Sequence, residues 1–122
     1  MNGEKAACGA FLLVAFADAH FDKREEARFL GGVVNDAAFA AMSAPRLADH
    51  YNKLRAVLER DYDAAEADIL AAIRAVRTQG AAVAAIKTAA RQAVVADHEI
   101  KPQEEVVLGR IAAALGIAAA EL

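Results

Sequence analysis

Two ten-residue stretches near opposite ends of this chain carry the same acidic pattern, and this duplication constrains the fold more than any other feature. The first reads ADAHFDKREE at 17–26, and the second reads ADHEIKPQEE at 96–105. In each copy a glutamate follows an aspartate by seven positions, which gives two pairs: Asp18 with Glu25, and Asp97 with Glu104. The repetition predicts that one structural unit occurs twice, over 6–31 and 85–110.

The surroundings of the two acidic stretches predict the same local structure. A nearly continuous apolar segment precedes each stretch, at 6–17 and at 81–96. A helix that is apolar all round is buried on most sides. A short connection then leads to a second predicted helix, and a short connection forces two successive helices into an antiparallel hairpin. We therefore expect two hairpins related by an approximate two-fold axis, with the segment 36–79 wrapping between them.

The composition indicates that the predicted elements are helices. Alanine fills 34 of the 122 positions, whereas glycine fills 7 and proline 2. Alanine has the highest helix propensity, and its small side chain lets helix axes approach closely. The length suits one domain with its own hydrophobic core. We predict an all-α fold, with a single compact domain over 1–122.

Residues that favour the start or the end of a helix occur throughout the middle of the chain. A helix is expected to begin near Asp22, and a short one to end near Met42. Ser43 followed by Pro45 predicts the next start. The following helix is expected to start at a capping box formed by Asp63 and Glu66. It is expected to stop at Gly80, because glycine commonly follows the end of a helix. Apolar residues at helical spacing predict two inner faces: Leu47, Tyr51, Leu54 and Leu58, then Ile69, Leu70, Ile73 and Val76.

The last long helix is expected to begin at Pro102, because proline is tolerated in the first turn of a helix. It is expected to end at Gly116, with a short terminal helix after Ile117. Four of its apolar side chains are predicted to face the core: Val106, Val107, Ile111 and Leu115.

Charge and cysteine content exclude several classes of function. The formal charge is −3, whereas a nucleic-acid-binding surface needs a basic face.

The apolar run at 6–17 is too short to span a bilayer, which takes about 20 residues. Glu4 precedes that run, so a signal peptide is not favoured. Cys8 is the sole cysteine, and a buried, inert thiol is expected there. We expect a cytoplasmic protein.

The duplicated carboxylates are the strongest candidate for a functional site. Hard cations bind several carboxylate oxygens at about 2.0–2.6 Å, and two hairpin ends that meet could supply four carboxylates. Clustered carboxylates repel and raise one another's pKa values, a penalty that a bound cation reverses. A histidine and a glutamate at one shared repeat position could add ligands. The candidate ligands for a divalent metal are therefore Asp18, His20, Glu25, Asp97, Glu99 and Glu104.

Two other interpretations of the acidic stretches remain open. The glutamates could simply stabilise helix N-termini, each by about 0.3–1 kcal/mol, and the aspartates could accept hydrogen bonds in turns. Alternatively, the chain is an interaction module whose acidic end docks a basic partner without a metal. An enzyme is the least favoured class, because the sequence contains no HExxH, GxSxG or glycine-rich phosphate loop. Neither stretch fits an EF-hand loop.

The second stretch resembles the signature of the TerB tellurite resistance family, which typically reads Ala-Asp-Gly-Glu-Ile-Asp-Pro-x-Glu where two helices join. His98 stands where the family has glycine, and Lys101 where it has the second aspartate. The matching residues of this copy are Ala96, Asp97, Glu99, Ile100, Pro102 and Glu104. In the first copy the matching residues are Ala17, Asp18, Asp22 and Glu25.

The resemblance to the TerB family carries its own expectations. It implies an all-α fold of about seven helices with internal pseudo-symmetry. It also implies a non-enzymatic protein linked to resistance to tellurite and other stresses. Such a protein would chelate metal through its acidic residues and act with partner proteins at the inner membrane surface. His20, as a ligand in place of an acid, would shift the preference toward zinc, manganese or nickel over calcium.

Overall fold

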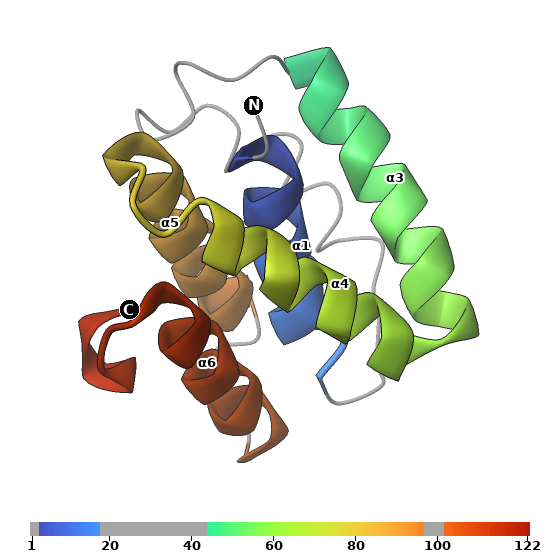
Figure 1. The fold of residues 1–122 in the computed structure, drawn as a ribbon. Helices are drawn as coiled ribbons and strands as arrows, with labels where there is room; N and C mark the ends of the chain where they lie inside the picture. Colours follow the sequence, from blue (N-terminus) through green and yellow to red (C-terminus); the bar gives the residue numbers. More distant parts are fainter. Residues whose placement is uncertain (1–2, 18–43, 97–101) are drawn as a thin grey trace.

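The computed structural model describes residues 3–17, 44–96 and 102–122 (Figure 1). These ranges contain helices and no strand, which confirms the all-α prediction for the part described. Two expected helices, one beginning near Asp22 and one ending near Met42, lie outside it, so five α-helices stand where about seven were expected. The elements are α1 (Gly3–Ala15), α3 (Ala44–Arg60), α4 (Tyr62–Ala75), α5 (Gly80–Ala96), α6 (Pro102–Leu115) and the 3-10 helix η3 (Ala119–Glu121).

Helix α1 is the core of the bundle. All its residues except Lys5 are buried, as expected of a helix that is apolar on every side. It packs most extensively against α5, and also against α3, α4 and α6 (Figure 1). Its small side chains leave room for this close packing, because alanine and glycine let neighbouring helix axes approach.

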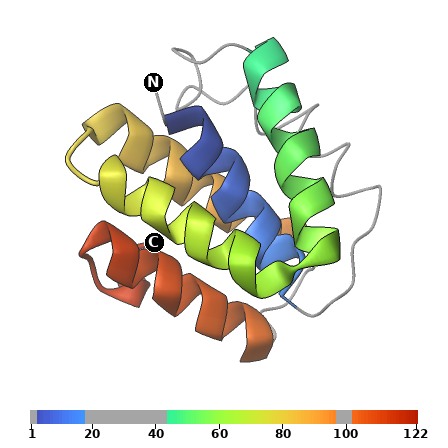
Figure 2. The same ribbon diagram turned by 45° about the vertical axis from the view of Figure 1, so that its right-hand side comes forward.

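Helices α1 and α5 are the two apolar helices that precede the acidic stretches. In both views they run side by side in the same direction, so their C-terminal ends lie at one end of the bundle (Figures 1 and 2). Helix α6 starts at that end and runs back in the opposite direction. We call this the motif end, defined by the last described residue after α1, Ala17, the last residue of α5, Ala96, and the first residue of α6, Pro102.

The predicted inner face of α3 is confirmed, because Leu47, Tyr51, Leu54 and Leu58 are all buried. The ring of Tyr51 lies against that of Phe11 in α1, with their centroids 6.4 Å apart.

The predicted capping of α4 at Asp63 is wrong. The N-cap of α4 is Asp61, whose Oδ1 accepts a hydrogen bond from the Ala64 amide at 3.2 Å. Helix α3 continues to Arg60, so a single residue separates the two helices. That residue must therefore be the cap, and Asp63 falls inside the first turn of α4, where its negative charge is still favourable. Of the inner face predicted for α4, Ile69, Ile73 and Val76 are buried, whereas Leu70 is half-buried.

Gly80 opens α5 instead of stopping α4. Helix α4 ends at Ala75, five residues earlier, and the amide of its C-cap residue Val76 donates to Ile73 O at 3.2 Å. A turn follows, in which the Gln79 amide donates to Val76 O at 2.9 Å. The chain therefore leaves the helix without using the glycine.

Helix α6 begins at Pro102 and ends before Gly116, as predicted. Gly116 has a φ of 76°, a conformation that glycine adopts without strain. Its amide donates to Ala113 O at 3.1 Å, and the Ile117 amide donates to Ala112 O at 3.0 Å. This pair of bonds is a Schellman motif, which satisfies the last carbonyl groups of the helix.

Val106 was expected to face the core, but 54% of its surface is exposed. Helix α6 lies at the edge of the bundle and packs mainly against α4 and α1. A single stripe of buried apolar residues, Val107, Ile111 and Leu115, covers that contact. Val106 precedes this stripe by one position and therefore lies on the outer side of the helix.

No helix in the described part of the chain is long and apolar enough to cross a membrane.

Gly9 of α1 lies directly against Ile69 of α4. A Cβ built at Gly9 would collide with the side chain of Ile69, which is fully buried. Gly9→Ala is expected to destabilise the fold by about 1–2 kcal/mol, because overpacking outweighs the gain in helix propensity. Gly109→Ala is the matched control, since nothing lies within 4 Å of its Cβ position. It is expected to add up to about 1 kcal/mol.

Urea unfolding of the two glycine variants measures both effects. A Gly9→Ala protein that is as stable as Gly109→Ala would show that α1 and α4 are not in close contact.

Candidate functional site

Of the six predicted ligands, Glu104 alone lies within the described residues. The other five, Asp18, His20, Glu25, Asp97 and Glu99, lie outside them. The structure nevertheless describes the ends from which two of these residues continue, because Ala17 and Ala96 immediately precede Asp18 and Asp97. Both ends lie at the motif end, beside the start of α6 (Figures 1 and 2).

Glu104 is fully buried, with 0% of its surface exposed. It lies in the first turn of α6, where the helix dipole favours negative charge. The dipole alone does not require burial, because Glu105 occupies the same turn and is exposed. Burying a carboxylate is costly unless hydrogen-bond donors or a cation compensate it. The motif end therefore places an ionisable carboxyl group inside the protein.

The chemistry of Glu104 fits a hard divalent cation. Carboxylate oxygens are the preferred ligands of such ions, and a buried one has already lost its water. Within the ranges 3–17, 44–96 and 102–122, no group of three or more His, Cys, Asp and Glu side chains gathers to hold a metal. A complete ligand set would therefore need residues from 18–43 or 97–101 as well.

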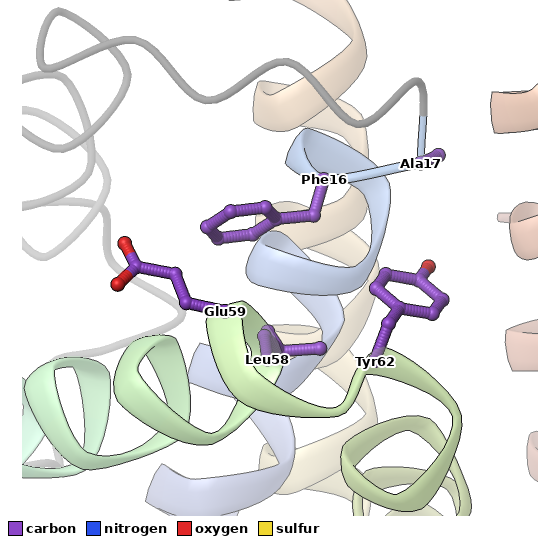
Figure 3. A pocket seen from close by; sticks show the side chains of 5 residues that line it. All are labelled: Phe16, Ala17, Leu58, Glu59 and Tyr62. Carbon is purple, nitrogen blue, oxygen red and sulfur yellow. The ribbon is translucent and has the colours of Figure 1, made fainter.

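A pocket opens at the same end of the bundle and was not predicted from the sequence. It encloses about 470 Å³, and its described lining residues are Phe16, Ala17, Leu58, Glu59 and Tyr62 (Figure 3). We call it the aromatic pocket. The lining comes from the turn that directly follows α1, the end of α3 and the start of α4. Because three separate helices contribute, no local sequence pattern reveals the pocket.

Tyr62 lines the pocket and is also hydrogen-bonded to the central helix α1. Its hydroxyl donates a hydrogen bond to Leu13 O at 3.1 Å. Burial raises the pKa of Tyr62 to about 12, and the negative charges of Glu66 and Asp63 add to the increase, while Arg110 opposes it. The phenol therefore keeps its proton at neutral pH and remains the donor of this bond. Glu66 is itself held by Arg110, whose Nη1 lies 2.7 Å from Oε1.

A second buried acid lies at the opposite end of α1. Glu4 is 5% exposed, and its Oε1 lies 4.0 Å from Nη1 of Arg46. One turn further along, the Cys8 thiol donates to Leu47 O at 3.3 Å. Burial raises the pKa of Cys8 to about 12, and the charge of Glu4 adds to the increase. The thiol is thus protonated and inert, as expected from the sequence.

The raised pKa of Cys8 predicts a loss of stability at alkaline pH. The unfolded thiol releases its proton near its ordinary pKa of 9.0, whereas the folded thiol keeps it until about pH 12. The unfolded state therefore binds fewer protons between these values, and stability falls as pH rises through that window. Between about pH 8 and pH 10, wild type should lose about 1.4 kcal/mol more than Cys8→Ala.

Urea unfolding at the two pH values measures the alkaline effect. An equal loss in wild type and Cys8→Ala would show that the thiol is accessible to water.

Comparison with known proteins adds one finding. A family model described as tellurite resistance protein TerB matches residues 4–122, essentially the whole chain. The chain has no significant match among curated proteins or among solved structures. The family match agrees with the resemblance carried by the two acidic stretches.

Proposed function

Because the chain belongs to the TerB tellurite resistance family, we propose that it is a non-enzymatic accessory protein of tellurite and stress resistance that holds a divalent metal at the motif end. The burial of Glu104 carries this proposal, because it provides a desolvated oxygen ligand where the family signature lies. The proposed ligands are Asp18, His20, Glu25, Asp97, Glu99 and Glu104.

The packing of the two apolar helices supports a shared site. Helices α1 and α5 run side by side in the same direction, so the chain segments that follow them start from the same end of the bundle. Each segment begins with an aspartate of the duplicated pattern, Asp18 or Asp97. Two pseudo-symmetric hairpins would bring these carboxylates toward Glu104, and this geometry remains a prediction for 18–43 and 97–101.

A bound cation would neutralise the acidic ligands and tie the two hairpins together. Carboxylates alone suit calcium or magnesium, whereas a histidine ligand at position 20 would favour manganese, zinc or nickel. The protein is proposed to act in the cytoplasm with protein partners at the inner membrane surface, as the family resemblance implies. The competing proposal is a metal-free interaction module that uses the same acidic surface.

Metal content and thermal stability distinguish the two proposals. The protein is purified without chelator, its metal content is measured, and melting is recorded with EDTA and with Ca²⁺, Mg²⁺, Mn²⁺ or Zn²⁺. An ion present at 100 times its dissociation constant should add about 2.7 kcal/mol of stability. No bound metal and no shift with any of these ions would favour the interaction module.

A further inference from the structure

The aromatic pocket has an apolar middle and two polar ends. Leu58 is buried, and Phe16 and Ala17 are half-buried, so these three form an apolar surface. In Figure 3 the side chains of Phe16 and Leu58 lie between those of Glu59 and Tyr62. The volume of about 470 Å³ falls within the range of small-molecule sites, which is about 300–1,000 Å³. The space is larger than one side chain and open enough for a segment of another molecule.

Both polar ends of the pocket accept hydrogen bonds. The Tyr62 hydroxyl uses its hydrogen in the bond to Leu13 O, so what it offers a ligand is its oxygen. Glu59, which is half exposed at 52%, offers a carboxylate. Its Oε1 lies 3.2 Å from Nε of Arg55, but a carboxylate has about four lone-pair sites, so one such contact does not exhaust it. A ligand that matches this pocket must donate at its ends.

The charges around the pocket also favour a donor that is positively charged. Asp61 and Asp63 flank Tyr62 in the sequence, and Glu59 precedes it by three positions. Burial is the main cause of the raised pKa of Tyr62, and the negative charges of Glu66 and Asp63 add to the increase, while Arg110 opposes it. Aromatic faces attract cations as well, and long basic side chains lay their methylene stems along apolar surfaces.

We propose that the aromatic pocket binds a lysine or arginine side chain of a partner protein, with the stem over Phe16 and Leu58 and the charged head at Glu59. None of the five described lining residues is among the proposed metal ligands, so binding of a basic side chain does not require a bound metal. The pocket lies at the motif end, which would place such a partner beside the duplicated acidic stretches.

Solution NMR with minimal probes tests the proposal. The ¹⁵N-labelled protein is titrated in EDTA with Nα-acetyl-arginine methylamide, so failure of the metal proposal does not affect the result. Shifts are expected at the amides of 16–17 and 58–62, with a dissociation constant on the order of 1–10 mM. The uncharged analogue Nα-acetyl-norleucine methylamide should bind about threefold to fivefold more weakly, because it lacks the ion pair. Nα-acetyl-glutamate methylamide should not bind in the pocket.

Two variants complete the experiment. Glu59→Gln should weaken the arginine probe by about threefold to fivefold, and Glu105→Gln, an exposed acid on α6, should leave it unchanged. Equal binding of the norleucine probe, or equal weakening by both variants, would overturn the proposal. So would the absence of pocket shifts from the arginine probe up to about 50 mM, which would mean that another part of this chain or a second copy covers the pocket.

Discussion

Replacing Leu13 by aspartate is expected to leave the chain unfolded. Leu13 is fully buried in α1, the helix that contacts every other α-helix of the described bundle. An unpaired carboxylate there costs several kcal/mol, and the lost apolar packing adds about 2–5 kcal/mol. The total stability of a domain this size is about 5–15 kcal/mol. Circular dichroism and size-exclusion chromatography should show loss of helix and of the compact form.

Val106→Asp is the matched control for the Leu13 substitution. It introduces the same charge in α6, at a side chain that is 54% exposed. Its stability should change by no more than about 0.5 kcal/mol. A Leu13→Asp protein that stays helical and melts cooperatively near wild type would contradict the central position of α1.

Replacing Glu104 by glutamine is expected to abolish stabilisation by divalent ions. Wild type should gain about 2.7 kcal/mol from an ion at 100 times its dissociation constant, and the variant should gain almost nothing. Glutamine keeps the shape of the side chain but supplies no charge. In EDTA the difference between the variant and wild type should be smaller than the difference measured with the ion, because the variant loses only the ion-dependent part of the stability. Melting curves of both proteins, with and without the ion, measure these differences.

Glu105→Gln is the control for the Glu104 substitution, since Glu105 is exposed in the same turn. It should keep the full ion-dependent shift. If Glu104→Gln lost the same amount of stability with EDTA and with every ion, Glu104 would have a purely structural role.

Much of the helical layout could be predicted from the sequence because its signals are local. The apolar run of α1 predicts burial by itself, and Pro102 and Gly116 bound α6 through their own backbone preferences. The start of α4 could not be placed in this way. Asp61 and Asp63 are both suitable caps, and the point where α3 ends decides between them.

The exposure of Val106 and the burial of Glu104 have one cause. Glu104, Val107, Ile111 and Leu115 follow one another at helical spacing, and all four are buried. The position of α6 at the bundle edge allows only that one stripe to face inward. A sequence prediction that assigned only this one stripe to the core would have placed Glu104 on the inner face of α6 and Val106 on its outer face. The aromatic pocket could not be predicted, because it needs the relative positions of three helices.

The most direct test of the proposed metal site is anomalous diffraction from a crystal grown with Mn²⁺. We predict a single strong anomalous peak at the motif end, about 2.0–2.6 Å from a carboxylate oxygen of Glu104, with further ligands from the two acidic stretches. A crystal in which Glu104 is well ordered, and in which no anomalous peak lies beside it, would contradict the proposal.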